Sequence, residues 1–538
     1  MISISNIFGW LSPVFGLLLS TSSWGADYFV RATGDDSAIG TSKTAAWKSV
    51  GRANQASLRA GDRLLFESGC SFSGNLHLRA DEGGTDSEPV TIGSFGPGRA
   101  TILAGQTIGI TLESAGGVIV RDLVVSGDGR TNNNGCGILC DNRLTTGQRL
   151  SHLQIEDSDI SGFGVFGILI SGNVAGYEHV VVRGCVLHDN LRGGMEIAGR
   201  LPIDATNYAH ADVIVTDCMA WGNTGDPNYL KNHSGSGIVL YQVDGGLMDR
   251  CVAWNNGAQC RNKGGGGVGL WTCASRDVVI QHCESFANQT SGADGGGFDI
   301  DGGCIRCVLQ YNYSHDNAGP GLMVYTYAYA AYSDRDNIVR FNVAENDSRN
   351  SRHYAGLYVN SYGPRMTGLR IYNNTIITGS WTDQAAAVHG EGVEATFRNN
   401  IFLAGQKAVP LRVFNPHEQL RFESNLYASD GGAIEVDWGG LRFSSLVAWR
   451  QATAPGIHGS QPSGIFGLPL FNGHTSGFRP FARAGFEEIM AFRPRRASPV
   501  IDAGMNLSAG SAPQPVIEDI ARRKLPNTGP WPIGALTR

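Results

Sequence analysis

The sequence lacks the features of collagen and of disordered chains. It has only 20 prolines among 538 residues, and its 74 glycines follow no three-residue period, which excludes a collagen helix. Charged residues make up 17% and apolar residues 42%, which excludes a disordered chain. Because glycine costs about 1 kcal/mol relative to alanine inside a helix, so much glycine favours a chain that turns often.

Two further absences narrow the class of protein. The net charge is −6 and no strong basic block is present, which argues against nucleic-acid binding. No second apolar run of membrane-spanning length follows the N-terminal run, Ile7 to Leu19, so the mature chain is expected to lack a membrane span. Small residues follow that run, with Ser23 and Gly25 at the −3 and −1 positions of a cleavage site. We expect residues 1–25 to be a signal peptide and the protein to be secreted or periplasmic.

An internal repeat runs through most of the chain. Its clearest copies surround aligned cysteines that are 33, 33 and 32 residues apart, at Cys185, Cys218, Cys251 and Cys283. A second column lies five residues further along each repeat, at Asn190, Asn223, Asn256, Asn288 and Asn317. Short β-branched runs separated by glycine or asparagine turns indicate that each repeat is one coil of a parallel β-helix. Equivalent residues of successive coils would stack about 4.8 Å apart, so we interpret both columns as structural ladders.

The cysteines suit this architecture better than a metal site. The odd count of 11 leaves at least one cysteine unpaired. The aligned cysteines would lie in a line rather than around a point, so they are expected to pack as small apolar groups. Cys273 and Cys304 lie near equivalent turns of adjacent coils and could form a disulfide.

The two ends of the chain differ from the repeats. Residues 26–100 are expected to form an N-terminal cap and first coil, with a short helix from Ala45 to Leu58. Residues 101–440 would then form the β-helix with about ten or more coils, and residues 441–538 a loop-rich C-terminal cap packed on it. A second short helix is predicted from Ser444 to Gln451.

Short motifs at both ends and in the repeats carry a family resemblance. They are Tyr28 to Gly34, Trp47, the Ala60-Gly61-Asp62 turn, the Asn-Tyr-Ser-His-Asp-Asn repeat at 312–317 and the closing Ser-Pro-Val-Ile-Asp-Ala-Gly at 498–504. With these motifs the chain resembles secreted bacterial right-handed parallel β-helix proteins of the pectate-lyase-like superfamily. The resemblance implies an all-β, single-stranded solenoid and a carbohydrate-active protein, but that superfamily contains lyases, hydrolases, epimerases and non-catalytic members.

Period-2 alternation in the strands after the asparagine turns predicts which side chains face solvent. It places Val268, Phe298 and Ile300 inward, and Asp299 and Asp301 outward. One outward column reads Glu196, Val239, Gly269, Asp299, Met323, Tyr358 and His389, and the next reads Ala198, Tyr241, Trp271, Asp301, Tyr325, Asn360 and Glu391. In this register Gly269 lies one coil below Asp299 and leaves space beside it.

Aromatic rings on this face point to a glycan groove, because flat rings bury large apolar area against the faces of sugars. The candidate substrate-binding residues are Trp271, Tyr241, Tyr325, Tyr358, His233, His315, Asn360 and Glu196. Lys263, Arg261 and Lys231 lie near the groove in sequence and suggest an acidic extracellular or cell-wall polysaccharide. No nucleic acid is expected as a partner.

The densest cluster of carboxylates is the string from Asp294 to Asp301. Asp299 and Asp301 are two residues apart on one face, so their Cα atoms lie about 6.6 Å apart. Two carboxylates at such a spacing suit the acid and the base of glycoside hydrolysis, with Asp294 tuning or sharing the task. The cluster is similar to the sites of polygalacturonase-like hydrolases, although this chain lacks their adjacent Asp-Asp pair on the following coil.

Two alternatives stay open. Asp294, Asp299 and Asp301 could hold Ca²⁺, with Lys263 as the base of a β-elimination or C5 epimerisation on a uronic-acid polymer. This string also resembles calcium-dependent β-helix pectate lyases, in which a lysine stands three residues after the phenylalanine of an Asp-Gly-Phe turn. Asp301 occupies that position here, which favours hydrolysis. The second alternative is a non-catalytic glycan-binding β-helix.

Overall fold

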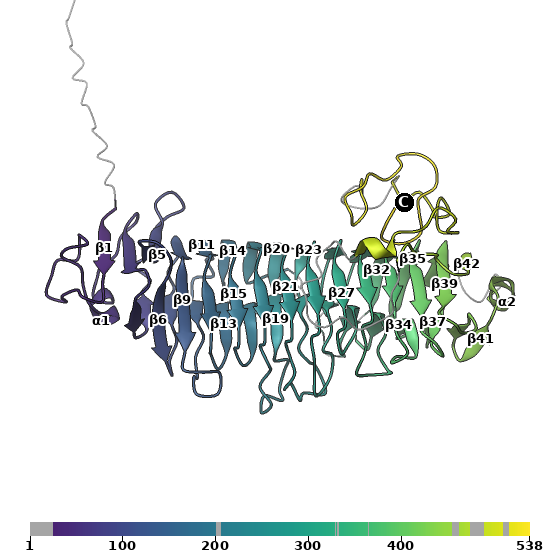
Figure 1. Ribbon diagram of the computed structural model, residues 1–538, viewed down its shortest axis with the longest axis horizontal. Helices are drawn as coiled ribbons and strands as arrows, with labels where there is room; N and C mark the ends of the chain where they lie inside the picture. The colour runs from purple at the N-terminus through teal and green to yellow at the C-terminus, as the bar shows by residue number, and fades with distance from the viewer. Residues whose placement is uncertain are drawn as a thin grey trace, which may run out of the picture.

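The chain forms one elongated solenoid of stacked coils (Figure 1). The structure is a computed structural model that describes residues 25–200, 206–328, 330, 333–363, 365–453, 462–473, 489–508 and 516–537. Apart from Gly25, the expected signal peptide lies outside these residues. No helix in this described part is long and apolar enough to cross a membrane.

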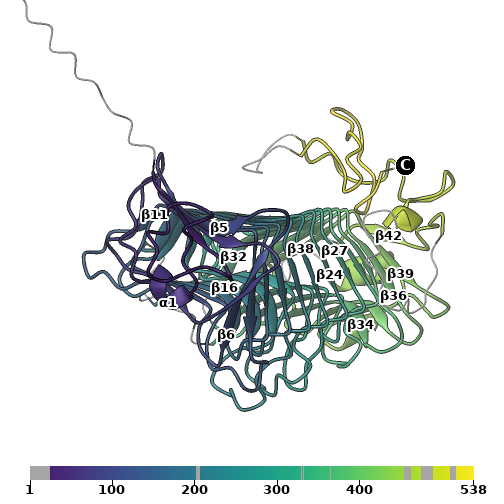
Figure 2. The same ribbon diagram turned by 60° about the vertical axis from the view of Figure 1, so that its left-hand side comes forward.

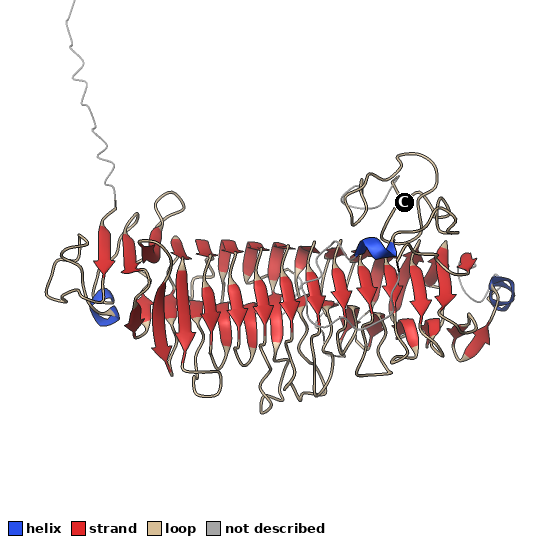
Figure 3. Cartoon of the chain, viewed as in Figure 1, coloured by secondary structure: helices blue, strands red, loops and turns tan. Residues whose placement is uncertain are grey.

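Three sheets of 14 strands each form the walls of the solenoid (Figure 3). Sheet 1 contains, in spatial order, β1 (Asp27–Val30), β2 (Arg63–Glu67), β5 (Val90–Phe95), β8 (Val118–Arg121), β11 (Leu150–Glu156), β14 (Tyr177–Arg183), β17 (His210–Thr216), β20 (Val243–Asp249), β23 (Arg276–Gln281), β26 (Val308–Gln310), β29 (Ile338–Arg340), β32 (Met366–Tyr372), β35 (Val393–Arg398) and β38 (Leu420–Glu423). Sheet 2 contains β3 (Ser71–Ser73), β6 (Ala100–Gly105), β9 (Leu123–Gly127), β12 (Asp159–Ser161), β15 (Val186–His188), β18 (Met219–Trp221), β21 (Val252–Trp254), β24 (Glu284–Phe286), β27 (Tyr313–His315), β30 (Val343–Glu345), β33 (Thr375–Ile377), β36 (Ile401–Ala404), β39 (Asn425–Ser429) and β42 (Gly464–Phe466). Sheet 3 contains β4 (Leu76–Leu78), β7 (Ile110–Glu113), β10 (Ile138–Asn142), β13 (Phe166–Gly172), β16 (Gly193–Gly199), β19 (Ser236–Tyr241), β22 (Leu270–Cys273), β25 (Phe298–Asp301), β28 (Leu322–Thr326), β31 (Leu357–Ser361), β34 (Gln384–His389), β37 (Val409–Val413), β40 (Val436–Trp438) and β41 (Leu441–Phe443).

Each strand pairs in parallel with the strand one coil away, except that β40 and β41 are antiparallel. Alternate side chains of the parallel strands point into one continuous core, as Phe298 and Ile300 do from β25. The predicted all-β, right-handed parallel β-helix is therefore confirmed.

The asparagine column forms a hydrogen-bonded ladder inside the solenoid. The Nδ2 of Asn223 donates to Oδ1 of Asn256 at 2.9 Å, and Asn256 donates in the same way to Asn288 at 3.0 Å. The aligned cysteine Cys251 is fully buried, and its thiol lies 3.6 Å from the carbonyl oxygen of Asp249. Both columns are structural, as their spacing predicts.

The N-terminal segment covers the open end of the first coil (Figure 2). The side chain of Trp47 is 1% exposed and stacks on Tyr28 with ring centroids 5.1 Å apart. The predicted helix from Ala45 to Leu58 is too long, because α1 spans only Val50–Ala53. The backbone of Trp47 pairs with the first strand, donating to Phe29 and accepting from Arg31, and so cannot form helical hydrogen bonds.

At the other end, α2 (Leu446–Ala452) begins after the cap residue Ser445 and confirms the second predicted helix within two residues. The fully buried Trp449 of α2 packs against Phe422, Tyr427 and Trp438 and closes the last coils. A 3₁₀ helix, η1 (Ile489–Phe492), and the later C-terminal residues lie on the outside of the solenoid near its C-terminal coils (Figure 1).

The predicted disulfide between Cys273 and Cys304 is wrong. All eleven cysteines are free thiols. The side chain of Cys304 is buried in the core, whereas Cys273 lies on the outer face of sheet 3 beside Asp301. The two side chains therefore point to opposite sides of the solenoid wall.

Candidate functional site

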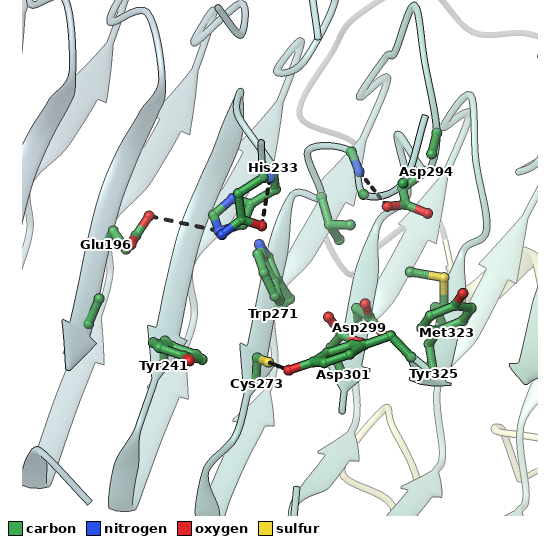
Figure 4. A pocket seen from close by; sticks show the side chains of 18 of the residues that line it. Glu196, His233, Tyr241, Trp271, Cys273, Asp294, Asp299, Asp301, Met323 and Tyr325 are labelled. Carbon is green, nitrogen blue, oxygen red and sulfur yellow. Dashed lines mark hydrogen bonds and ion pairs between the residues drawn. The ribbon is translucent and has the colours of Figure 1, made fainter. Parts of the chain in front are cut away.

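A pocket of about 820 Å³ lies on the outer face of sheet 3 (Figure 4). Strands β13, β16, β19, β22, β25 and β28 form its floor, and the turns that precede several of these strands form its rim. Ten of the residues predicted for the site line this pocket: Glu196, His233, Tyr241, Lys263, Trp271, Asp294, Asp299, Asp301, Tyr325 and Tyr358.

Glycine runs allow the rim turns to lie close to one another. A Cβ atom on Gly266 would lie 1.8 Å from the carbonyl oxygen of Ala293 in the next coil. A Cβ atom on Gly297 would lie 2.3 Å from the Ser314 hydroxyl. These contacts leave no room for a side chain, so the glycines near the aspartates are required for close packing of the coils.

The observed register corrects part of the predicted outward columns. Trp271 lies beside Asp299, and Cys273 beside Asp301, so the predicted pairings of Gly269 with Asp299 and of Trp271 with Asp301 are each wrong by two residues. Gly269 faces inward, where an added Cβ would lie 2.0 Å from the Ser285 hydroxyl. The strand begins at Leu270, and Gly269, not Gly267, is the glycine equivalent to Gly237 and Gly297.

The same slip affects two other predicted positions. Val268 packs in the apolar cluster of the outer face with Trp271, although alternation predicted it inward. His389 lies beside Asn360 and not beside Tyr358, whose neighbour is Ala387. At β34 the strand is offset by two residues, which keeps the face of its side chains and changes their neighbours. Val268 is affected because β22 begins only at Leu270, so Val268 lies in the preceding turn, where strand alternation does not apply.

Asp299 and Asp301 project from β25 into the pocket, as predicted. Asp299 is 2% exposed, and its Oδ1 has no hydrogen-bond partner among the described residues. Burial, followed by repulsion from Asp301, raises the pKa of Asp299 well above its usual range. Burial also raises the pKa of Asp301 to about 8, against a hydrogen bond from the Gly302 amide that lowers it. Asp301 is more accessible than Asp299 and therefore better placed to meet a ligand.

Asp294 occupies the turn before β25 and is held by two donors. Its Oδ2 accepts a hydrogen bond from the Gly266 amide at 2.6 Å, and its Oδ1 accepts one from the Tyr354 hydroxyl at 2.9 Å. Burial raises the pKa of Asp294, whereas both hydrogen bonds lower it. The residue has a φ of 56°, a left-handed conformation that aspartate tolerates better than most residues. The structure thus fixes the direction of this carboxylate.

Asp334 holds the turn that follows β25 and Asp301. Its fully buried carboxylate accepts hydrogen bonds from the Cys304 amide and from the Thr326 hydroxyl. Burial raises the pKa of Asp334 to about 7. A buried carboxylate at this position adds negative charge near Asp301 and so helps to keep Asp301 protonated.

Aromatic side chains line the side of the pocket that follows the aspartates along the chain. They include the predicted Tyr325 and Tyr358 and also Tyr327, Tyr354 and Tyr362. The Tyr358 ring is 1% exposed, and its hydroxyl lies 3.0 Å from the His353 Nε2 and accepts a hydrogen bond from Asn360. Trp271 and Tyr241 lie on the other side of the aspartates (Figure 4).

Two of the predicted binding residues do not line the pocket. His315 lies on β27 in sheet 2, stacked between Phe286 and Tyr313 and paired with Glu284 and Asp316. These contacts explain its place in the repeat without a ligand, so its assignment to the groove is wrong. Asn360 is fully buried, and its side-chain amide donates a hydrogen bond to the Tyr358 hydroxyl. It can therefore influence a ligand only by positioning Tyr358.

Several residues of the pocket were missed in the sequence, and Tyr354 is the most important of them. It lies two residues before Gly356, in the same kind of turn that holds Asp294 before Gly297 and Lys263 before Gly267. A comparison of these turns beyond Asp294 would have identified Tyr354. Cys273 was missed because of the register slip before β22.

The three aspartates do not fit the predicted calcium site. The described residues contain no group of three or more His, Cys, Asp or Glu side chains arranged to hold a metal ion. Both oxygens of Asp294 already accept hydrogen bonds, and burial favours the protonated forms of Asp299 and Asp301. Because Ca²⁺ prefers ionised, converging carboxylates, we derive no chemical step through calcium.

Comparisons with known proteins agree with the observed fold. Residues 151–343 match a family model described as the right handed beta helix region. A lacto-N-biosidase of Bifidobacterium longum subsp. longum is 23% identical to this chain over 526 residues, which cover 78% of this chain and 32% of that enzyme. This chain therefore spans about a third of the length of that curated relative.

Two crystal structures of a GH136 lacto-N-biosidase from Eubacterium ramulus are also similar. The native form has a TM-score of 0.50 and 18% identity, covering 72% of this chain and 65% of that chain. The selenomethionine form has a TM-score of 0.51 and 17% identity, covering 78% and 68% of the two chains. The chain thus has a right-handed parallel β-helix fold, which is similar to that of these lacto-N-biosidases.

Proposed function

We propose that this protein is a glycoside hydrolase that cleaves a glycan bound in the pocket of sheet 3. The observation that carries the proposal is a set of three carboxylates in contrasting environments within one aromatic-lined pocket. Asp301 favours its protonated form, whereas Asp294 is held by two hydrogen-bond donors. Such a contrast is what separates the acid from the base or nucleophile in glycoside hydrolysis. The similarity to lacto-N-biosidases supports the same reaction class.

Asp301 is the general acid in this proposal. Its proton passes to the glycosidic oxygen while the bond from that oxygen to the anomeric carbon breaks. Asp294, as the ionised carboxylate, either attacks the anomeric carbon or removes a proton from the water that does so. In both routes one water is consumed and one reducing end is formed.

Asp299 acts on Asp301 more than on the glycan. The sequence suggested Asp299 and Asp301 as the acid and the base, but the 2% exposure of Asp299 leaves little of its carboxyl group accessible to a glycan. Repulsion from Asp301 raises the pKa of Asp299, so the pair holds a proton at neutral pH and the carboxyl group beside Asp301 stays uncharged.

The substrate is a glycan that offers flat apolar faces to Trp271, Tyr241 and Tyr325. Lys231 and Lys263 are exposed on the pocket rim and are suited to acidic substituents on that glycan. The expected signal peptide supports action outside the cytoplasm, either secreted or periplasmic.

The test is incubation of the purified protein with the aryl glycoside of lacto-N-biose and with neutral and uronate-containing polysaccharides, each with added calcium or with chelator. New reducing ends without ultraviolet absorbance from an unsaturated sugar support hydrolysis. That absorbance would instead indicate β-elimination, with Lys263 as the candidate base. Glycan binding without any product would indicate the non-catalytic alternative.

Asp301→Asn and Asp294→Asn should each reduce hydrolysis by about 10²-fold or more, the usual contribution of a general acid or base. Glu156→Gln is a matched control, because Glu156 lies on sheet 1 and pairs with Arg183 away from the pocket. Full activity in both aspartate variants would contradict the proposed roles.

A further inference from the structure

We propose that Glu196 and His233 form a distal sugar-binding subsite in the same pocket, which makes the enzyme recognise an oligosaccharide rather than a single sugar. The inference rests on the proposed hydrolase function and adds the size of the substrate to it. Figure 4 shows both residues on the side of Trp271 that is away from Asp299 and Asp301.

The strand register fixes how far this subsite lies from the aspartates. Glu196 on β16 lies beside Val239 on β19, which lies beside Trp271 on β22, which lies beside Asp299 on β25. Three strand spacings of ~4.8 Å place the Cα atoms of Glu196 and Asp299 about 14 Å apart. This distance exceeds one sugar ring, so a group bound at Glu196 belongs to a different unit of the glycan from the one being cleaved.

The Glu196 carboxylate has unused capacity to accept hydrogen bonds. Its side chain is 18% exposed, and its nearest ion-pair partner, the His233 Nε2, lies 3.9 Å away, beyond hydrogen-bond distance. Within the described residues it accepts no hydrogen bond, and burial raises its pKa to about 7. A largely buried carboxyl group with no donor costs free energy unless a ligand satisfies it. Sugar hydroxyls are donors of the right kind.

His233 is held in place on the rim of the pocket, in the turn before β19. The indole Nε1 of Trp271 donates to the Ser236 hydroxyl at 3.1 Å, and that hydroxyl lies 3.4 Å from the His233 Nδ1. The Trp271 ring also meets the His233 ring edge to face, with centroids 4.7 Å apart. Since the Ser236 oxygen accepts from Trp271, its own hydrogen is free to be donated to Nδ1, which leaves the His233 Nε2 protonated and directed towards Glu196.

The two residues therefore present one acceptor and one donor side by side. Burial lowers the pKa of His233 to about 4, so its ring is neutral at neutral pH and adds no charge. A neutral N–H donor beside a carboxylate acceptor matches adjacent hydroxyls of a sugar, each of which can donate and accept. Tyr241 lies on β19, the strand that follows His233, and offers an aromatic contact for a neighbouring part of the glycan.

The experiment compares aryl glycosides of a monosaccharide, a disaccharide and a trisaccharide as substrates of the wild type, Glu196→Gln and His233→Ala. The trisaccharide glycoside is the substrate that reaches the distal subsite. Each variant should lower its kcat/KM by about 10- to 100-fold, as expected for losing a hydrogen bond to a charged or fixed polar group. The monosaccharide glycoside should be cleaved at the wild-type rate. Glu156→Gln should leave all three substrates unaffected, and circular dichroism should show unchanged folding for every variant.

Equal loss on all three substrates, or no loss on any, would overturn the subsite. If the wild type cleaves none of them, the proposed hydrolase function fails while the subsite is still tested by calorimetry. In that case the trisaccharide should bind Glu196→Gln at least about 10-fold more weakly than the wild type. Equal affinities would then reject the subsite independently of catalysis.

Discussion

Tyr354 and Asp294 lie 60 residues apart in the chain and form a reciprocal pair of hydrogen bonds. The Tyr354 hydroxyl donates to the Asp294 Oδ1 at 2.9 Å and accepts from the Asp294 backbone amide at 3.2 Å. The contact joins the turn before β31 to the turn before β25, two coils earlier. The orientation of the proposed base or nucleophile therefore depends on a residue that does not itself need to touch the reacting atoms.

Tyr354→Phe should lower kcat with little change in KM. The variant keeps the ring but removes the donor to Asp294, which is worth about 1.5–3 kcal/mol when the acceptor is charged, or roughly 10- to 100-fold in rate. Because the donor stabilises the ionised form of Asp294, the acidic limb of the pH–rate profile should also move to higher pH. Steady-state kinetics across pH measure both effects. Tyr362→Phe, at another tyrosine of the pocket, is the control, and an unshifted profile in Tyr354→Phe would contradict this role.

The pH dependence of kcat/KM should be bell-shaped, with its alkaline limb set by the Asp301 site. The acid must be protonated, so activity should fall as pH rises through the pKa of about 8 that burial gives this group. The neighbouring Asp299 shares this titration, so the limb reports the pair. Asp334→Asn removes a carboxylate whose charge raises the pKa of Asp301, and it should move the alkaline limb to lower pH. A limb that stays in place would show that Asp334 does not tune the acid.

Folding stability should fall as pH rises from about 4 to about 8. Buried carboxyl groups with raised pKa values, such as Asp301, Asp334 and Glu196, bind protons in the folded state at pH values where they are already ionised in the unfolded state. The folded state then holds more protons, so the free energy of unfolding decreases with pH across this window. Differential scanning calorimetry at several pH values measures this slope. In Asp301→Asn the slope should be smaller, because one titrating group is lost.

Removing one rung of the asparagine ladder should destabilise the solenoid. Asn256→Ala leaves the Asn223 side-chain amide and the Ala220 carbonyl without their partner, at a cost of about 1–3 kcal/mol per buried group. Thermal unfolding should show a clearly lower Tm. Asn350→Ala, at an exposed position, should change Tm much less. Equal Tm values for the two variants would show that the ladder is energetically unimportant.

All eleven cysteines should react as free thiols once the chain is unfolded. Alkylation in denaturant without reductant, followed by mass measurement of the whole protein, should add one label per cysteine present. A reductant should leave the Tm of the folded protein unchanged. Fewer labels in a freshly prepared sample would reveal a disulfide, contrary to the opposite orientations of Cys273 and Cys304.

The fold could be predicted from the sequence because each coil repeats the same physical solution. Asn223 and Asn256 recur at the spacing that a ladder requires, and the alternation around Phe298 and Ile300 gives the core face directly. The choice of neighbours was harder to predict. The glycines at 264–267 and 269 offer more than one alignment with the neighbouring coils, and alternation cannot detect a shift of two residues because such a shift preserves the face.

The candidate site was predicted where its residues lie on strands and missed where contacts cross coils. Asp299 and Asp301 follow from period 2 within one strand, whereas the contact of Tyr354 with Asp294 depends on the shapes of two separate turns. His315 shows the opposite error. Its recurring sequence context suggested a ligand, but stacking on Phe286 in sheet 2 accounts for it.

The one-coil repeat of sheet 3 has a consequence for how the proposed glycan-binding pocket can diverge. Glu196 and Asp299 are separated by a whole number of coils, so the span between them can change only in steps of about 4.8 Å. Duplication or loss of one coil between them would lengthen or shorten the bound glycan segment while leaving both ends of the pocket chemically intact. In this architecture, the length of the glycan that the proposed pocket can bind is inherited as a count of repeats, separately from the proposed catalytic residues.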